Sequence, residues 1–193
     1  MKLQDLDIKG FMAATSGSDP VPGGGSISAL CGALSAALAE MVTGLTIGRK
    51  KYVEVEEEMK ALAPKMAEAQ VKFLQFIDDD ADAYNVVFDA FKLPKETDEE
   101  KAALVPLEVA KTAVEIMDAI AVIAAKGNQN AITDACVAMM CARTATFGAL
   151  LNVRINLSSL KDADKVAELT LQCDKLHAEA NFKEQQLLNS INL

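Results

Sequence analysis

The chain has 193 residues, of which 51% are hydrophobic and 24% are charged, and its formal net charge is −9. Such a composition excludes a disordered chain, and the length predicts a single domain over residues 1–193 with a substantial core. The acidic excess argues against a nucleic-acid partner, because binding to phosphates needs a basic face. Any anionic substrate must therefore meet a local cluster of basic residues.

Cysteine and histidine usage limits the chemistry further. The four cysteines form no CxxC pair, and the chain opens on Met-Lys-Leu-Gln-Asp with no apolar leader behind it. We therefore expect reduced thiols in a cytoplasmic protein. His177 is the only histidine, so the clustered ligands of a zinc site are absent and no metal is predicted. Neither GxxxxGK[ST] nor GxGxxG occurs, which argues against a P-loop ATPase or a Rossmann enzyme.

The first third of the chain predicts two helices around a break. A short amphipathic helix over 3–16 has as candidate core contacts Leu3, Leu6, Ile8, Phe11 and Met12. The segment 18–26 is too rich in Pro and Gly for a helix. The almost wholly apolar segment 27–47 is long enough to span a bilayer, but four polar residues interrupt it, Ser28, Ser35, Glu40 and Thr43. We predict that it is a central buried helix and that the protein is not in a membrane.

The remainder of the chain also predicts helices. Over 53–91 a 3.6-residue period connects Met59, Leu62, Met66, Phe73, Ile77, Tyr84, Phe88 and Phe91. A turn over 93–98 leads to a helix over 98–126, in which Pro106 predicts a kink or a restart. A helix capped by Thr133 or Asp134 reaches residue 151 or beyond, and a last helix covers 162–189. No strand pattern of useful length occurs, so the predicted fold class is all-α, an antiparallel bundle of about six helices.

The glycine-rich segment before the buried helix is the first candidate site. Gly23, Gly24 and Gly25 let the backbone approach a ligand closely, and Ser26 opens a helix whose first N–H groups lack partners. Such a helix start can hold a carboxylate, a pterin carbonyl or a developing anion. The alternative is a flexible connector in which Ser26 is an ordinary N-cap.

The acidic run 78–82 is the second candidate. At 100° per residue Asp79 falls opposite Ile77 and Asp82 faces solvent, whereas Asp80 lies about 60° from Ile77 and is aimed into the apolar face. Asp78 borders that face on its other flank. A half-buried carboxylate tends to a raised pKa, which suits a general acid at neutral pH. The alternatives are a buried acid paired with Lys or Arg, or one that caps a neighbouring helix.

Amide and basic side chains form the third group. Asn152 and Asn156 are four residues apart and share a helical face, which indicates recognition of a planar polar group or, alternatively, C-terminal capping. Asn128 and Asp134 stand in a polar segment before this helix. The stretch 49–51, Arg-Lys-Lys, is the main concentration of positive charge and could hold an acidic tail or offset the acidic surface.

These segments together resemble the formiminotetrahydrofolate cyclodeaminase family. The resemblance rests on PVPGGGSISALCGALSAALAEMV at 20–42, TIGRKKY at 46–52, IDDDADAY at 77–84, LPKETDEEK at 93–101, GNQNAITDA at 127–135 and GALLNVRINL at 148–157. They stand in the family's order and cover most of the chain. Between residues 100 and 106 the chain is shorter than the family pattern.

The resemblance implies a helical subunit that forms a homodimer or a higher homo-oligomer, with a tetrahydrofolate site near a subunit interface. It implies either cyclisation of 5-formiminotetrahydrofolate to 5,10-methenyltetrahydrofolate with loss of ammonia, or hydrolysis of the methenyl ring to 10-formyltetrahydrofolate. It leaves open how many glutamates the substrate tail carries, and it implies no cofactor. A helical scaffold that has lost catalysis is the third alternative.

The resemblance also suggests roles for individual residues. It places the catalytic aspartate in the pair Asp78 and Asp80, and the helical geometry selects Asp80, with Asp78 or Asp134 as helper. Motif positions expected at the substrate are Gly23, Gly24, Gly25, Ser26, Asn128, Asn152, Arg154 and Asn156, with Arg49 and Lys50 at its glutamate tail. Nothing precedes the bundle, so no formiminotransferase activity is expected.

Overall fold

The computed structural model describes residues 2–90 and 97–191, without the side chains of residues 84–102. Six α-helices are described: α1 (Ile8–Thr15), α2 (Gly24–Thr46), α3 (Glu56–Ala90), α4 (Thr97–Lys126), α5 (Ile132–Leu157) and α6 (Ala163–Ser190). Short 3₁₀ segments at Leu3–Asp5, Lys50–Val55 and Gln129–Ala131 connect them. The described ranges contain no strand, so the predicted all-α bundle is confirmed.

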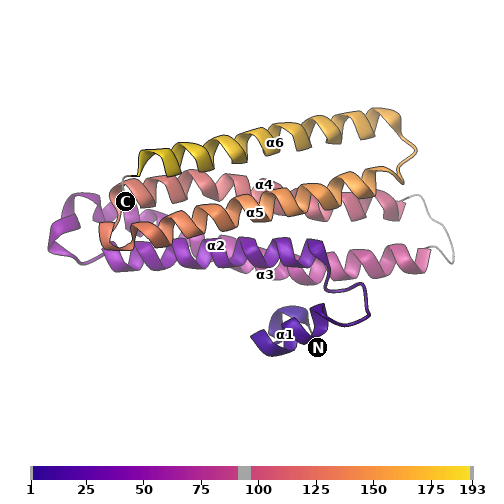
Figure 1. Ribbon diagram of the computed structural model, residues 1–193, viewed down its shortest axis with the longest axis horizontal. Coiled ribbons are helices and arrows are strands. Elements are labelled where there is room, and N and C mark those ends of the chain that lie inside the picture. Colours follow the sequence, from indigo (N-terminus) through magenta and orange to yellow (C-terminus); the bar gives the residue numbers. More distant parts are fainter. Residues whose placement is uncertain (1, 91–96, 192–193) are drawn as a thin grey trace.

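Helices α2 to α5 form an antiparallel four-helix bundle. In it α2 packs against α3 and α5, and α4 packs against α5. Helix α6 lies along α4 and α5, while α1 lies below α2 and α3 near the start of α2 (Figure 1). The start of α2 and the 3₁₀ segment Lys50–Val55 are therefore at opposite ends of one long helix.

Small side chains allow α2 and α5 to approach closely. The two helices carry many buried alanines: Ala29, Ala33, Ala36 and Ala39 on α2, and Ala135, Ala138, Ala142, Ala145 and Ala149 on α5. The buried serines of α2 keep their hydroxyls satisfied by backbone carbonyls: Ser28 donates to Gly24 O at 2.7 Å and Ser35 to Ala138 O at 2.7 Å. The polar residues that interrupt this apolar segment are thus compatible with a buried helix.

The contact between α2 and α3 depends on a glycine. A Cβ atom on Gly32 would overlap the ring of Phe73, which is fully buried. We therefore expect Gly32→Ala to lower the free energy of unfolding by about 1–3 kcal/mol, as other overpacked cores do. Gly44→Ala in the same helix meets no atom within 4 Å and should instead stabilise the protein by about 0.5–1 kcal/mol. Denaturant titrations of the two variants test this, and equal stabilities would contradict it.

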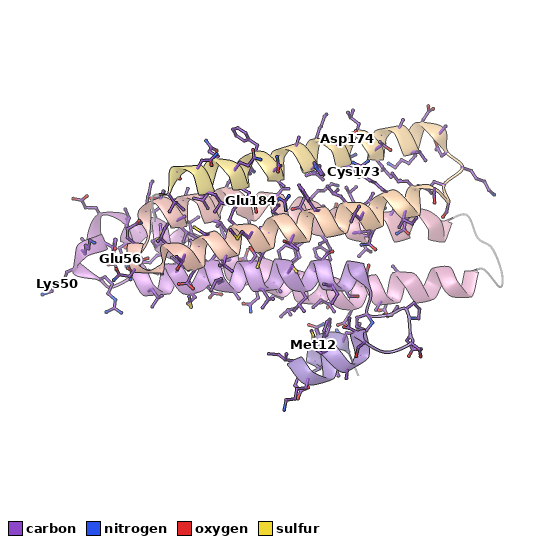
Figure 2. All side chains as sticks on the ribbon, in the orientation of Figure 1. Met12, Lys50, Glu56, Cys173, Asp174 and Glu184 are labelled. Carbon is purple, nitrogen blue, oxygen red and sulfur yellow. The ribbon has the colours of Figure 1, made fainter. Side chains whose placement is uncertain are left out.

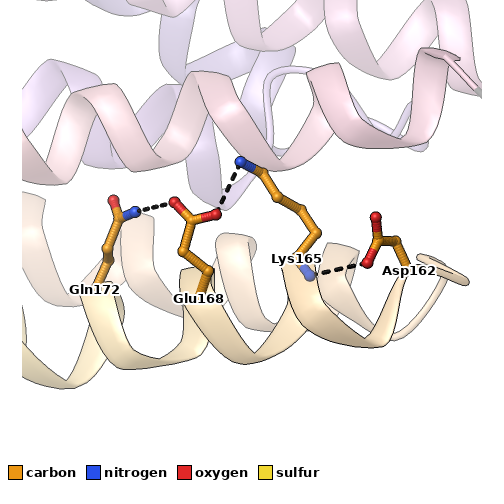
Figure 3. A network of polar contacts seen from close by, with 4 residues as sticks. All are labelled: Asp162, Lys165, Glu168 and Gln172. Carbon is orange, nitrogen blue, oxygen red and sulfur yellow. Dashed lines mark hydrogen bonds and ion pairs between the residues drawn. The ribbon is translucent and has the colours of Figure 1, made fainter.

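Helix α6 begins within one residue of its predicted start, and Asp162 caps it. The Asp162 carboxylate accepts a hydrogen bond from the backbone N–H of Lys165 at 3.0 Å. One turn on, the Lys165 ammonium pairs with Glu168 at 3.2 Å, and Gln172 donates to the other oxygen of Glu168 at 3.0 Å (Figure 3). This surface chain of polar contacts supports the first turns of the helix.

Three details of the predicted helices were wrong. Of the kink or restart predicted at Pro106, the restart is wrong: α4 is one helix through the proline, because Ala103, Leu107 and Ala110 on both sides are buried in one core, and that burial offsets the lost hydrogen bond. Of the core contacts expected for the first helix, Phe11 is buried whereas Ile8 and Met12 are largely exposed. Neither Thr133 nor Asp134 caps α5, whose N-cap position is Ala131.

Other predictions fall partly outside the described residues. In α3, Met59, Met66, Phe73 and Ile77 are buried as expected, and Leu62 packs against the core. The side chains of Tyr84 and Phe88, together with Phe91 and most of the turn predicted over 93–98, lie outside the description. The side chains of residues 100–102, in the segment predicted to be shorter than the family pattern, also lie outside the description.

Two helices are apolar beyond what the bundle requires. By length and composition α2 and the segment Gln129–Leu157 could each cross a membrane, but 50% of each apolar window is buried inside the bundle, as in core helices of soluble proteins. Their other sides expose apolar side chains, which we call the apolar outer face: Leu34, Met41, Leu45, Val137, Met140, Leu151 and Ile155.

Candidate active site

The carboxylate of Asp80 lies at the N-terminus of α2. The fully buried Ser26 donates its hydroxyl to Asp80 Oδ2 at 2.8 Å, and its backbone N–H also donates to this carboxylate. The same hydroxyl lies 3.4 Å from the carbonyl oxygen of Ile77. Ser26 thus fixes the position of the carboxylate relative to the helix start.

Burial sets the protonation of Asp80. Loss of solvent raises the pKa of this carboxyl above its usual value, and the two hydrogen bonds from Ser26 lower it by less. No lysine or arginine in the described part of the chain contributes to this shift, which removes the alternative of an acid held in an ion pair. The capping alternative holds, since Asp80 does cap α2. A capping carboxyl with a raised pKa can still accept and return a proton.

The glycines allow backbone and side chains to meet at this point. A Cβ atom on Gly25 would overlap the Asp80 carboxylate, with 2.6 Å to Oδ2, so only glycine permits the approach. Gly24 faces Asn152 of α5, whose amide nitrogen would be 3.4 Å from a Cβ atom there. Asn152 is half-buried and donates to Gly148 O at 2.9 Å, and the half-buried Asn156 follows one turn later. The glycine loop (residues 23–25), the Asp80 carboxylate and the asparagine stripe (Asn152 and Asn156) therefore lie at the same end of the bundle.

Comparison with known proteins decides the family. The model of the formiminotransferase-cyclodeaminase family matches residues 7–175. The chain belongs to this family. A methenyltetrahydrofolate cyclohydrolase of Methylorubrum extorquens is 37% identical, with 95% of each chain covered. A formimidoyltransferase-cyclodeaminase of mouse is 35% identical, and the alignment covers 83% of this chain but 32% of that protein.

The fold agrees with that of a solved member of the cyclodeaminase family. The crystal structure of formiminotetrahydrofolate cyclodeaminase from Thermotoga maritima superposes with a TM-score of 0.92, at 27% identity and with 96% of each chain covered. The family resemblance found in the sequence is therefore confirmed, and so is the expectation that the chain is an enzyme.

Asp78, the proposed helper in this cyclodeaminase-like chain, has a structural role. It is buried, its Oδ1 accepts the backbone N–H of Leu3 at 2.7 Å, and its Oδ2 accepts the side-chain amide of Gln4. These contacts anchor the N-terminal segment on α3 and occupy both oxygens. Of the pair, Asp80 remains the candidate for proton transfer. Nothing in the sequence indicated this contact, because the partners are 75 and 74 residues apart.

The basic residues expected at the substrate lie at the opposite end of the bundle. Arg49, Lys50 and Lys51 line a cavity of about 470 Å³ together with Tyr52, Asn128 and Asn130. Figure 2 labels Lys50 at the end of the bundle remote from α1. Since α2 has 23 residues, its two ends are about 34 Å apart. Asp134, in the first turn of α5, is at this remote end as well. Within a single chain these residues cannot share a pocket with Asp80.

The polar atoms of Asn128 already have partners in the bundle. Its amide donates to Leu45 O at 3.0 Å, and its carbonyl oxygen accepts the backbone N–H of Asn130 at 3.1 Å. Its own N–H donates to Thr46 Oγ1 at 2.8 Å. Asn128 therefore ties the end of α2 to the connection between α4 and α5. Tyr52 also belongs to this cluster, since its hydroxyl accepts the N–H of Gln129 at 3.0 Å, a contact that no sequence spacing indicated.

Arg154 is turned away from the asparagine stripe. Its guanidinium pairs with Asp174 of α6 at 2.8 Å on the surface of the bundle. This ion pair links α5 to α6, so the Arg154 guanidinium is not directed at Asp80 or at the glycine loop. Among the described residues, no group of three or more His, Cys, Asp or Glu side chains could hold a metal ion.

Proposed function

We propose that the chain cyclises 5-formiminotetrahydrofolate to 5,10-methenyltetrahydrofolate with release of ammonia, and that the reaction takes place at Asp80. The single observation that carries the proposal is a carboxyl of raised pKa, fixed by Ser26 at the N-terminus of α2, in a chain of this family. Purified protein should turn over the formimino substrate and release one ammonia per methenyl group formed. Absence of any turnover would refute the proposal.

The chemistry requires two proton transfers. N10 of the folate attacks the carbon of the protonated formimino group and loses its proton, and the resulting amino group takes up that proton and leaves as ammonia. A single carboxylate can take the first proton and return the second, which is worth about 10² to 10⁴ in rate. Asp80 supplies this group, since its raised pKa brings the protonated form closer to neutral pH. The carbon keeps its oxidation state, so the proposed reaction needs no cofactor.

Substrate positioning falls to the neighbouring polar groups. Gly23 and Gly24 leave the helix start open to a pterin ring, and Asn152 and Asn156 present amides on the adjacent helix. Placing N10 against the reacting carbon contributes as much to the rate as the proton transfers do. We expect the Asn152→Ala substitution to raise KM. An unchanged KM would show that the asparagine stripe does not position the substrate.

A second candidate function uses the same residues. In the cyclohydrolase reaction water adds to the methenyl carbon, the ring opens, and 10-formyltetrahydrofolate is formed. The specific observation in its favour is the Methylorubrum extorquens relative of that name, of which this chain covers 95%. Side-by-side assays of the purified protein on both substrates separate the two functions.

The raised pKa of Asp80 predicts how stability depends on pH. Because the folded state binds this proton more tightly than the unfolded state, the contribution of Asp80 to stability falls as pH rises through the folded-state pKa. Asp80→Asn should therefore melt at a higher temperature than the wild type near neutral pH, and the difference should shrink as pH falls to about 4. Melting temperatures across this range are the measurement, and a difference that grows toward acid pH would contradict the burial argument.

The protein is also proposed to act as a cytoplasmic single-domain homo-oligomer, at least a dimer. The support for an oligomer is the apolar outer face, where large apolar side chains are exposed along both α2 and α5. Light scattering on the purified protein measures the subunit number.

A further inference from the structure

A cavity of about 600 Å³ lies between α3 and α4, and its described lining residues include neither Asp80 nor Ser26. All of them belong to α3 and α4, whereas α6 lies along α4 and α5 (Figure 1). A volume of this size is typical of a site for a small molecule. The apolar part of the lining consists of Leu62, Met66 and Ala69 on α3 and Ile116, Ala119 and Val122 on α4.

The lining also contains a threonine whose hydroxyl has no hydrogen-bond partner in the described part of the chain. This residue, Thr112, is only 4% exposed. Other helical threonines, Thr144, Thr146 and Thr170, each donate to the backbone carbonyl four residues earlier, at 2.9, 2.9 and 2.7 Å. A buried polar group without a partner lowers stability, so native proteins rarely keep one. The Thr112 hydroxyl therefore indicates a contact that the chain itself does not supply.

An ion pair fixes the alignment of the two walls of the cavity. Lys126 Nζ of α4 lies 2.8 Å from a carboxylate oxygen of Glu58 on α3. Because the two helices are antiparallel, each step forward along α3 corresponds to a step back along α4. This register places Thr112 level with Lys72, while Leu62 lies about 15 Å away at the other end of the cavity.

Charged side chains of both signs line the cavity. Lys65, Glu68 and Lys72 belong to the α3 wall, and Glu115 and Asp118 belong to the α4 wall. Asp118 is already paired with a lysine of α6 at 2.9 Å, whereas the other four form no ion pair in the part of the chain that the structure describes. Three carboxylates and two ammonium groups disfavour a phosphate or another polyanion. Unpaired charges of both signs instead favour a ligand that also carries both signs.

We propose that this cavity binds a zwitterionic α-amino acid with an apolar side chain. Its carboxylate binds at Lys72 and at the Thr112 hydroxyl, which thereby gains the partner that it lacks. Its ammonium group binds at Glu115, which is three residues, or about 4.5 Å, from the level of Thr112 along α4. The ligand side chain then lies on the apolar lining toward Leu62. This site is independent of the folate chemistry proposed for Asp80.

Calorimetry with matched ligands tests the charge requirement. The purified full-length protein is titrated with L-phenylalanine, 3-phenylpropionate and 2-phenylethylamine, which share a phenyl ring but of which only the first carries both charges. L-Phenylalanine should bind at least about tenfold more tightly than either of the others. Equal or tighter binding of the acid or the amine would overturn the proposal. So would the absence of binding by all of L-phenylalanine, L-leucine and L-methionine.

Three substitutions test whether the amino acid binds in this cavity. Lys72→Gln and Glu115→Gln each remove one charged contact and should weaken binding about tenfold. Thr112→Val keeps the shape of the side chain and should weaken binding about threefold or more. Without ligand, Thr112→Val should be at least as stable as the wild type, because its hydroxyl has no hydrogen bond to lose.

Lys175→Gln is the matched control, since it removes an exposed lysine of α6 that does not line the cavity. Its affinity for the amino acid should equal that of the wild type. Wild-type affinity in both Lys72→Gln and Glu115→Gln would place the ligand elsewhere and overturn the proposal. A clear loss of stability in ligand-free Thr112→Val would show that the hydroxyl has a partner within the chain, which also counts against it. Because these measurements concern binding alone, their failure leaves the proposed folate reaction untouched.

Discussion

Replacing Asp80 with asparagine should reduce kcat at least about a hundredfold while the protein stays folded. Asparagine keeps the shape of the side chain and can still accept the hydrogen bond from the Ser26 hydroxyl, now at 2.8 Å from Oδ2. It cannot take the proton from N10 or return it to the leaving nitrogen. Circular dichroism and single-turnover assays on the formimino substrate give the two measurements.

The matched control for this variant is Asp82→Asn. Asp82 is two residues further along α3 and faces solvent, so the change removes the same charge without touching the helix start. Its kcat should remain near that of the wild type. Comparable losses in the two variants would point to the overall charge of the acidic run, and near-normal turnover by Asp80→Asn would remove Asp80 from the mechanism.

Helical periodicity was sufficient to distinguish Asp80 from Asp82 on α3. The positions of Asp79, Asp80 and Asp82 around the helix follow from 100° per residue, and the structure places Asp82 in solvent and Asp80 half-buried beside Ser26. The role of Asp78 did not follow from periodicity. Its partners, Leu3 and Gln4, belong to a separate segment whose docking on α3 depends on tertiary packing.

Motif order also gave no information about distance along the bundle. The glycine loop and the Arg-Lys-Lys stretch are motifs of one family, but they stand at the two ends of the same helix. A rigid helix of this length keeps them apart in one chain. Pro106 is a similar case, because the core on both sides of it outweighs a local preference.

The second large effect is expected at Gly25. Alanine there would place a methyl group against the Asp80 carboxylate, 2.6 Å from Oδ2, and both groups are on long helices that pack along most of their length. The carboxylate must therefore move, and a displacement of about 1 Å at a reacting group can reduce the rate about a hundredfold. Because Ser26 follows directly, its hydrogen bond to Asp80 should weaken too.

Gly25→Ala should thus lose about a hundredfold in kcat although no reactive group is removed. Gly44→Ala is its control in the same helix, since a Cβ atom there meets nothing within 4 Å. Kinetic and denaturant measurements on both proteins separate displacement of the carboxylate from a general effect of alanine on α2. A Gly25→Ala protein with normal kcat would mean that the contact between the helix start and Asp80 is not needed for turnover.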